Sequence, residues 1–115
     1  MKIMIVDDNA GMRELIRSVL WESELEFEEC KDGKEAVEKY ETFRPDWVLM
    51  DLSMEGMDGI SAIEALKTIH PAAKIVIVTD YNDKPLRQLA EKHGVEAYVL
   101  KENLPEIRII LQGEV

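Results

Sequence analysis

The sequence has a single cysteine, few basic residues and no long apolar run. Cys30 is the one cysteine in 115 residues, so no disulfide can form within the chain, and this usage is typical of a reducing compartment. No apolar stretch approaches the length of a membrane span, and no basic segment followed by an apolar one indicates a secretion signal. These absences predict a soluble, cytoplasmic chain that does not associate with membranes.

Positive charge is also scarce. Lys and Arg number 14 against 24 Asp and Glu, which gives a formal net charge of −10. Such a chain repels the phosphates of nucleic acids, so no direct nucleic acid binding is expected. The length predicts a single domain over residues 1–115, either complete or cut from a longer protein that carries an output domain.

Short apolar runs alternate with amphipathic segments five times. Strands are predicted at Lys2–Val6, Leu25–Cys30, Pro45–Asp51, Lys74–Thr79 and Ala97–Leu100, and helices from Asn9 to about Glu22, from Gly33 to about Phe43, from Asp58 to Ile69, from Asp83 to Gly94 and from Pro105 to Leu111. The alternation predicts an α/β fold of the flavodoxin-like (βα)5 type, with a doubly wound parallel five-stranded sheet in the order 2-1-3-4-5.

Polar side chains follow four of the five predicted strands. The third strand, a continuous apolar run, ends on Asp51; the first is followed by Asp7 and Asp8, the fourth ends on Thr79, and the fifth is followed by Lys101. In the predicted order these strands are neighbours about 4.8 Å apart, so the groups line up at the edge where ligands bind. Each group alone has an ordinary explanation as a cap or a solvated side chain, but their coincidence favours a site.

The chemistry of such a site follows from its charges. Carboxylates roughly 5 Å apart repel by about 3 kcal/mol per pair at an effective dielectric constant of 20, and a bound cation would offset this cost. Oxygen ligands with no histidine or cysteine nearby in sequence suit Mg²⁺. A lysine and a hydroxyl add donors for a phosphoryl group, and the central Asp51 can act as the nucleophile.

These residues, in this order, resemble the receiver domain of the two-component response-regulator family. The resemblance covers essentially the whole chain and rests on Ile5-Val6-Asp7-Asp8, Met50-Asp51-Leu52, Met57-Asp58-Gly59, Thr79 and Tyr98-Val99-Leu100-Lys101. It implies a phosphoacceptor signalling domain that catalyses only its own phosphorylation and dephosphorylation, and that is not an enzyme acting on a separate substrate.

The resemblance also implies a role for each acid. Asp51 would take the phosphoryl group from a phosphohistidine of a sensor histidine kinase or phosphotransfer protein. Asp8 and Asp51 would bind Mg²⁺ directly, Asp7 would act mainly through metal-bound water, and the backbone carbonyl of Ser53 would complete the protein ligands.

Three further residues would respond to the phosphoryl group. Thr79 and Lys101 would contact the acyl phosphate, and Thr79 with Tyr98 would form the switch that changes the partner-binding face. An ordinary half-buried strand aromatic is compatible with that role for Tyr98. The implied downstream partners are an output domain or target protein, together with a second copy of the chain in a phosphorylation-dependent homodimer.

The chain departs from the usual family pattern in three places. Met54-Glu55 stands where the family usually has Met-Pro, Asp80 stands where it has a small residue, and Glu102 follows Lys101 where it has proline. Glu55 and Asp80 bring extra negative charge and are expected to tune phosphorylation, while the Lys101–Glu102 peptide geometry stays open. The run Lys101-Glu102-Asn103 is similar to receivers attached to helix-turn-helix output domains.

Other functions fit the sequence less well. A flavin or dinucleotide protein of this architecture needs a glycine- or hydroxyl-rich loop after the first strand, where Asp7-Asp8 stands. Aspartate-based phosphatases usually separate their acid pair by one residue and carry a cap domain. The main alternative is a phosphorylation-independent receiver-like module for protein–protein interaction, with Asp80 and Glu55 blocking phosphorylation, and the retention of all five site residues argues against it.

Overall fold

Strands and helices alternate along the whole of the described chain. The structure, a computed structural model, describes residues 1–21, 24–53 and 58–113. Its elements are β1 (Lys2–Val6), α1 (Ala10–Val19), β2 (Glu26–Cys30), α2 (Gly33–Phe43), β3 (Trp47–Met50), α3 (Gly59–Ile69), β4 (Ile75–Thr79), α4 (Lys84–Lys92), β5 (Ala97–Leu100), a short 3₁₀ helix η1 (Lys101–Asn103) and α5 (Pro105–Leu111). None of these helices is long and apolar enough to cross a membrane.

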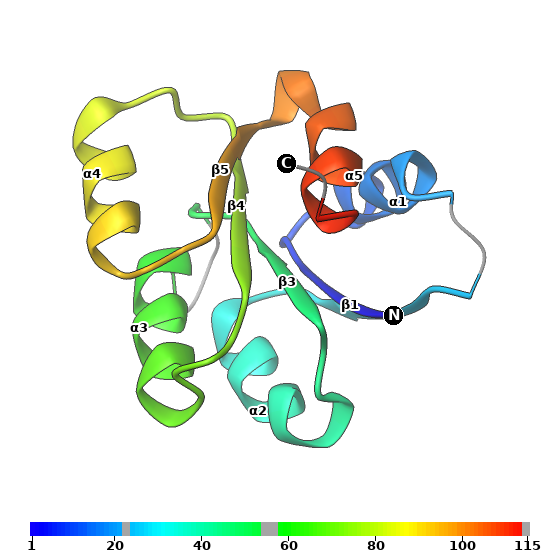
Figure 1. Cartoon of the computed structure of the whole chain (residues 1–115), viewed down its shortest axis with the longest axis horizontal. Coiled ribbons are helices and arrows are strands. Elements are labelled where there is room, and N and C mark those ends of the chain that lie inside the picture. The colour runs from blue at the N-terminus through cyan, green and yellow to red at the C-terminus, as the bar shows by residue number, and fades with distance from the viewer. Residues whose placement is uncertain (22–23, 54–57, 114–115) are drawn as a thin grey trace.

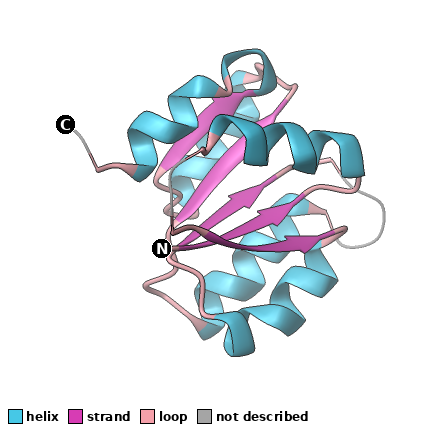
Figure 2. Ribbon diagram, turned by 90° about the vertical axis from the view of Figure 1, so that its right-hand side faces the viewer, coloured by secondary structure: helices cyan, strands magenta, loops and turns pink. Residues whose placement is uncertain are grey.

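The five strands form one sheet in the order β2-β1-β3-β4-β5, and each neighbouring pair is parallel. This confirms the predicted flavodoxin-like fold and strand order. Helices α1 and α5 cover one face of the sheet, while α2, α3 and α4 cover the other (Figure 1). Figure 2 shows the sheet enclosed between these two helical layers.

Burial on both faces explains why the central strands are apolar throughout. Along β1, Ile3 and Ile5 pack in the core beneath α1 and α5, whereas Met4 and Val6 pack in the core beneath α2 and α3. Side chains of a strand alternate between the two faces, so a strand covered on both sides needs an apolar residue at every position. The edge strand β2 is more exposed and carries three acids, Glu26, Glu28 and Glu29.

Four helices begin at side-chain caps. In each case a side-chain oxygen accepts a hydrogen bond from the backbone N–H three residues later, and the capping residues are Asn9, Asp32, Asp58 and Asp83. Helix α1 ends at Val19 instead of near Glu22, which lies outside the described residues. It ends early because Leu20 leaves the helical conformation, and its side chain is buried in the core that α5 covers.

Two other predictions differ from the structure. The helical spacing predicts Leu86, Leu89 and Ala90 on the inner face of α4, but Leu89 is 36% exposed and the prediction is wrong for that residue. The helix packs along the line of Leu86 and Ala90, four residues apart, and Leu89 lies beside this line. Strand β3 runs from Trp47 to Met50 instead of from Pro45 to Asp51, so Asp51 is the first residue after the strand.

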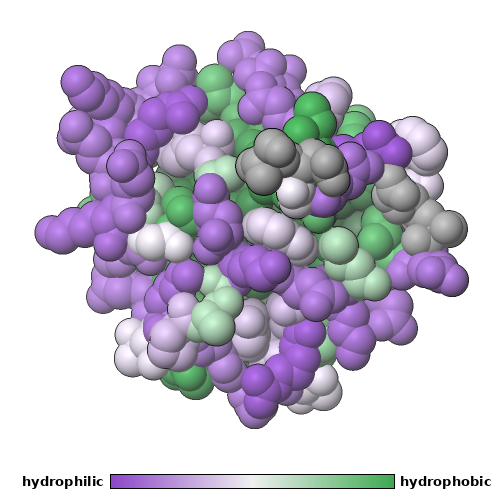
Figure 3. All heavy atoms as spheres, viewed as in Figure 1, coloured by the Kyte–Doolittle hydropathy of each residue, from purple (hydrophilic) through white to green (hydrophobic). Residues whose placement is uncertain are grey.

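Charged and polar side chains cover most of the face seen in Figure 3, with smaller apolar areas between them. Large apolar side chains that remain exposed include Leu15, Trp21, Ile69, Tyr81 and Ile109. The two faces of the sheet are filled by apolar cores, and the polar groups at the carboxyl ends of the strands lie outside these cores.

Candidate functional site

The strand register brings the polar residues to one edge of the sheet. Val6 of β1 pairs with Met50 of β3, so Asp7 and Asp51, the next residues, leave the sheet side by side. Their backbones continue the ladder, because the Asp51 N–H donates to the Val6 carbonyl at 3.0 Å and the Asp7 N–H donates to the Cys30 carbonyl at 3.0 Å. The position of both acids is thus set by the sheet itself.

Three carboxylates meet at this edge. Asp7, Asp8 and Asp51 each offer an oxygen, and these oxygens lie within 4.8 Å of one another. Asp7 is 1% exposed and Asp51 5% exposed, while Asp8 is open to solvent. Burying two acids of like charge this close is costly unless a cation shares the site.

Lys101 supplies one positive charge. Its Nζ lies 2.9 Å from Asp7 Oδ2 and 3.5 Å from Asp51 Oδ2. Asp7 Oδ1 accepts a hydrogen bond of 2.9 Å from the Asn9 N–H. Asp7 Oδ2 is buried and pairs with the Lys101 ammonium, and this single contact does not use all the lone pairs of the carboxylate. Lone pairs on a buried carboxylate therefore remain available, and this fits an oxygen-binding cation such as Mg²⁺.

The ionisation of Asp51 and Lys101 reflects this crowding. Burial raises the pKa of Asp51 to about 6, with the Asp7 charge adding to the rise, although Lys101 and the backbone N–H groups of Leu52 and Ser53 lower it. Burial lowers the pKa of Lys101, but its contact with Asp7 and the nearby Asp51 charge outweigh burial, so the pKa lies above its ordinary value. Near neutral pH the lysine is cationic and Asp51 is mostly ionised.

Thr79 and Asp80 lie at the carboxyl end of the neighbouring strand β4. Thr79 is fully buried, and its Oγ1 accepts a hydrogen bond of 3.4 Å from the Tyr81 N–H. Asp80 is exposed, but its charge is among those that raise the pKa of Lys101, so its field reaches the acid cluster. Glu55, the other expected tuning residue, lies outside the described residues.

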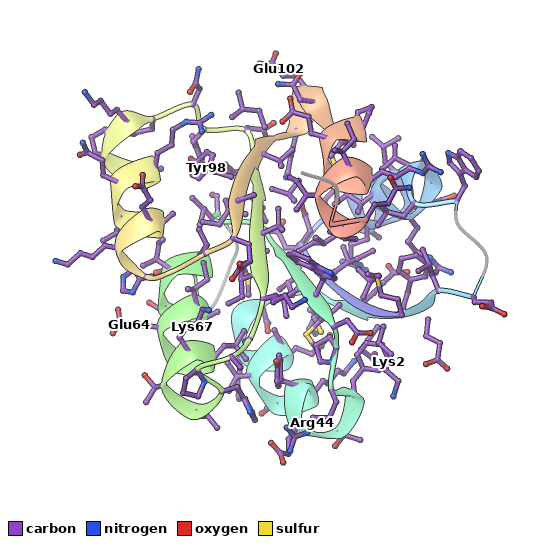
Figure 4. All side chains as sticks on the ribbon, in the orientation of Figure 1. Lys2, Arg44, Glu64, Lys67, Tyr98 and Glu102 are labelled. Carbon is purple, nitrogen blue, oxygen red and sulfur yellow. The ribbon has the colours of Figure 1, made fainter. Side chains whose placement is uncertain are left out.

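Ser53 and Tyr98 lie on the side of the site toward α4. Tyr98 is half-buried, and its hydroxyl donates to the Tyr81 carbonyl at 2.6 Å. The Arg87 guanidinium lies 4.4 Å from the centroid of the Tyr98 ring, so this aromatic stands between β5 and α4 (Figure 4). Ser53 is exposed, and its Oγ lies 3.4 Å from the Tyr81 hydroxyl. Tyr81, which no sequence pattern singles out, thus links both residues.

The comparisons with known proteins agree with this geometry. The family model of the response regulator receiver domain matches residues 3–112. The chain belongs to the response regulator receiver domain family. The chemotaxis protein CheY of Thermotoga maritima is 36% identical over 101 residues, which cover 87% of this chain and 84% of that protein.

Other receiver-containing relatives are longer. The transcriptional regulatory protein YhcZ of Bacillus subtilis is 39% identical over 108 residues, and the match covers 92% of this chain but only 50% of that protein. Among solved structures, a CheX–CheY–BeF₃–Mg complex from Borrelia burgdorferi aligns over 100% of this chain and 90% of that chain, with a TM-score of 0.89 and 20% identity. At this identity the likeness shows the fold.

The backbone next to Asp51 is in close contact with Gly59, the first residue of α3. A Cβ at this position would overlap the backbone carbonyl of Asp51 and lie 2.7 Å from the Cα of Leu52. Only glycine lets the start of α3 approach the loop after β3 this closely, and the Gly59 N–H donates to the Leu52 carbonyl at 3.2 Å. The glycine after the capping Asp58 is the sequence signal for this contact.

The structure also answers the question about the peptide after the lysine. No cis peptide bond occurs among the described residues, so the Lys101–Glu102 bond is trans. Glu102 is exposed at the start of η1, as Figure 4 shows, and it does not contribute to the acid cluster.

Proposed function

We propose that this receiver domain accepts a phosphoryl group on Asp51. The observation that carries the proposal is the position of Asp51, whose carboxylate lies at the end of the central strand, beside the acid pair and 3.5 Å from the Lys101 ammonium. A carboxylate oxygen of Asp51 would attack phosphorus, the bond from phosphorus to the donor histidine nitrogen would break, and that nitrogen would leave with its electron pair. The product is an acyl phosphate on Asp51.

The other residues act by position and charge. Lys101 stays cationic and would pair with an oxygen of the incoming phosphoryl group, while the buried Thr79 hydroxyl would donate to another. Because the pKa of Asp51 is about 6, its carboxylate is mostly ionised near neutral pH and can act as a nucleophile. Catalysis in this proposal is limited to the domain's own phosphorylation and dephosphorylation.

Mg²⁺ would be held by Asp8 and Asp51 directly, by Asp7 mainly through water, and by the Ser53 backbone carbonyl. The carboxylate oxygens of Asp7, Asp8 and Asp51, which lie within 4.8 Å of one another, support this assignment. The bound ion would neutralise the charge that accumulates on the phosphoryl oxygens. The Borrelia complex, a protein of the same fold, contains both Mg and BeF₃, which is consistent with the assignment.

We further propose the partners and the output. A sensor histidine kinase or phosphotransfer protein would supply the phosphoryl group, and Thr79 with Tyr98 would switch the partner-binding face. Residues 1–115 would form one domain, and an output domain or target protein would read the switch. A phosphorylation-dependent homodimer and a cytoplasmic location complete the proposal, with no direct contact to nucleic acid.

Intact-mass measurement after incubation with acetyl phosphate and Mg²⁺ tests the proposal. The wild-type chain should gain one phosphoryl group, and Asp51→Asn should gain none. Asp32→Asn, which alters a carboxylate at the start of α2, serves as the control and should be phosphorylated like the wild type. An adduct at full yield in Asp51→Asn would overturn the site, and a wild-type chain that takes no phosphoryl group would favour the phosphorylation-independent module.

A further inference from the structure

The backbone of Asp7 is held on both sides by hydrogen bonds outside the acid cluster. Its N–H donates to the Cys30 carbonyl of β2, and its carbonyl accepts from Arg13 Nη1 of α1 at 2.6 Å. The Arg13 side chain is only 17% exposed and therefore has few alternative positions. The Asp7 carbonyl is thus fixed by a side chain that does not itself belong to the acid cluster.

Arg13 is anchored in turn by Glu29 on the edge strand β2. Arg13 Nε donates to Glu29 Oε1 at 2.9 Å, and Arg17 Nη1 donates to Glu29 Oε2 at 2.9 Å. Arg13 and Arg17 are four residues apart on α1, so they share one face of the helix. Burial raises the pKa of Glu29, but the two arginine contacts outweigh it and lower the pKa, so the anchor is ionised near neutral pH.

We propose that Arg13 is a positioning residue for the Mg²⁺ site. The carbonyl of Asp7 and the N–H of Asp8 belong to the same planar peptide group. A hydrogen bond that fixes the carbonyl therefore also fixes the orientation of the backbone at Asp8. Arg13 therefore holds the plane that joins two of the three carboxylates, and Glu29 keeps Arg13 in place. The inference rests on the proposed function, because it presupposes that these acids bind Mg²⁺.

Positioning and simple electrostatics predict opposite results. Arg13 is a cation near a cation site, so by charge alone its removal would strengthen Mg²⁺ binding. If Arg13 acts by orienting Asp7 and Asp8, its removal weakens binding instead. Groups that orient metal ligands commonly change metal affinity by about 10- to 100-fold when they are mutated. The sign of the change therefore separates the two roles.

The experiment is calorimetric titration of the purified chain with Mg²⁺ at pH 7 and constant ionic strength. We expect Arg13→Met to raise the dissociation constant about tenfold. Arg17→Met is the matched control, because it removes a charge from the same helix and a contact to the same residue, Glu29. The Asp7 carbonyl accepts its hydrogen bond from Arg13 and not from Arg17, so the Mg²⁺ dissociation constant of Arg17→Met should stay within about twofold of the wild-type value. Circular dichroism confirms that each variant is folded before titration.

Two more variants keep the inference testable if Arg13→Met fails to fold. Arg13→Lys keeps the charge but cannot reach both partners in the same fork, so it should bind Mg²⁺ more weakly than the wild type. Glu29→Gln should weaken binding a few-fold in the wild-type background and have no further effect in an Arg13 variant, since its influence passes through Arg13.

The outcomes separate this inference from the proposed function. If the wild-type chain binds Mg²⁺ and every folded Arg13 variant binds it equally or more tightly, the positioning role is overturned and the proposed function stands. If the wild-type chain takes up no Mg²⁺, the metal site fails and the positioning role fails with it. An equal loss in Arg17→Met and Arg13→Met would also overturn the inference, because it would assign the effect to Glu29 pairing in general.

Discussion

Burial has opposite energetic effects in the middle of the sheet and at the carboxyl ends of its strands. In the middle, residues such as Ile5, Leu49 and Ile77 are fully or almost fully buried, and every contact they make stabilises the fold. At the edge, only one or two residues further along the same strands, Asp7 and Asp51 are buried as well, although burial there is costly. The same backbone ladder thus buries apolar side chains in one region and carboxylates in the other.

Truncation of a buried apolar residue that packs against the sheet should give the largest loss of stability. Leu66 of α3 is fully buried, so Leu66→Ala should lower the free energy of unfolding by about 2–5 kcal/mol. Ile69, one turn further along the same helix, is 59% exposed, and Ile69→Ala should change it by less than about 0.5 kcal/mol. Urea denaturation of both variants measures the contrast, and equal losses would mean that α3 does not pack as described.

Neutralising Asp51 should raise the free energy of unfolding instead of lowering it. The raised pKa of Asp51, about 6, means that the folded chain binds this proton more tightly than the unfolded chain. Metal-free wild type therefore loses stability as the pH rises from about 4 through 6, and Asp51→Asn does not. We expect Asp51→Asn to be more stable by about 2 kcal/mol at pH 8, with the difference vanishing near pH 4.

Urea denaturation across this pH range, without metal, provides the measurement. The difference in stability between the wild type and Asp51→Asn cancels the contribution of the other titrating groups, which both proteins share. A constant difference between them at all pH values would show that Asp51 titrates like an ordinary surface acid, and the contrast between edge and middle would then not hold.

Removing the exposed acid of the cluster should have a smaller effect. Asp8 is open to solvent, so its repulsion of Asp7 and Asp51 is screened to about 1 kcal/mol. Asp8→Asn should raise the metal-free stability by this amount and abolish the further gain from Mg²⁺. Glu14→Gln, at an exposed acid of α1, is the control. A less stable Asp8→Asn that Mg²⁺ still stabilises would contradict a shared metal site.

The smallest effect concerns the rate of phosphorylation. Asp80 contributes to the field at Lys101, so Asp80→Ala should take up phosphate from acetyl phosphate faster, by about twofold at low salt. Salt screens exposed charges, so the gain should shrink at high ionic strength. Glu91→Ala removes the same charge from the exposed side of α4 and should leave the rate unchanged. Stopped-flow measurement at two salt concentrations distinguishes them, and equal rates would show that Asp80 has no influence on uptake.

The sequence alone predicts the fold and the meeting of three acids at one edge of the sheet, because both follow from patterns along the chain. Apolar runs such as Ile75–Val78 identify buried strands, and the strand order then places Asp7, Asp8 and Asp51 together. Helix ends are harder, as α1 shows, because the burial of Leu20 depends on packing against α5 and not on local preference.

The supporting residues of the site escape sequence reasoning for a similar reason. Arg13 reads as an ordinary polar position of an amphipathic helix, and its contact with the Asp7 carbonyl exists only once α1 lies beside β1 and β2. Tyr81 likewise gains its contacts to Ser53 and Tyr98 from the packing of three separate loops and strands. Patterns along the chain identify the candidate site residues, whereas the tertiary structure shows which other residues hold them in place.

The central claim is that the acid edge is a cation site whose strength depends on the ionisation of Asp51. Calorimetric titration of the wild-type chain with Mg²⁺ at pH 5 and at pH 7 tests it most directly. With a pKa of about 6, Asp51 is mostly protonated at pH 5, so one Mg²⁺ should bind at pH 7 and about tenfold more weakly at pH 5. Equal affinity at the two pH values, or no binding at pH 7, would contradict the account.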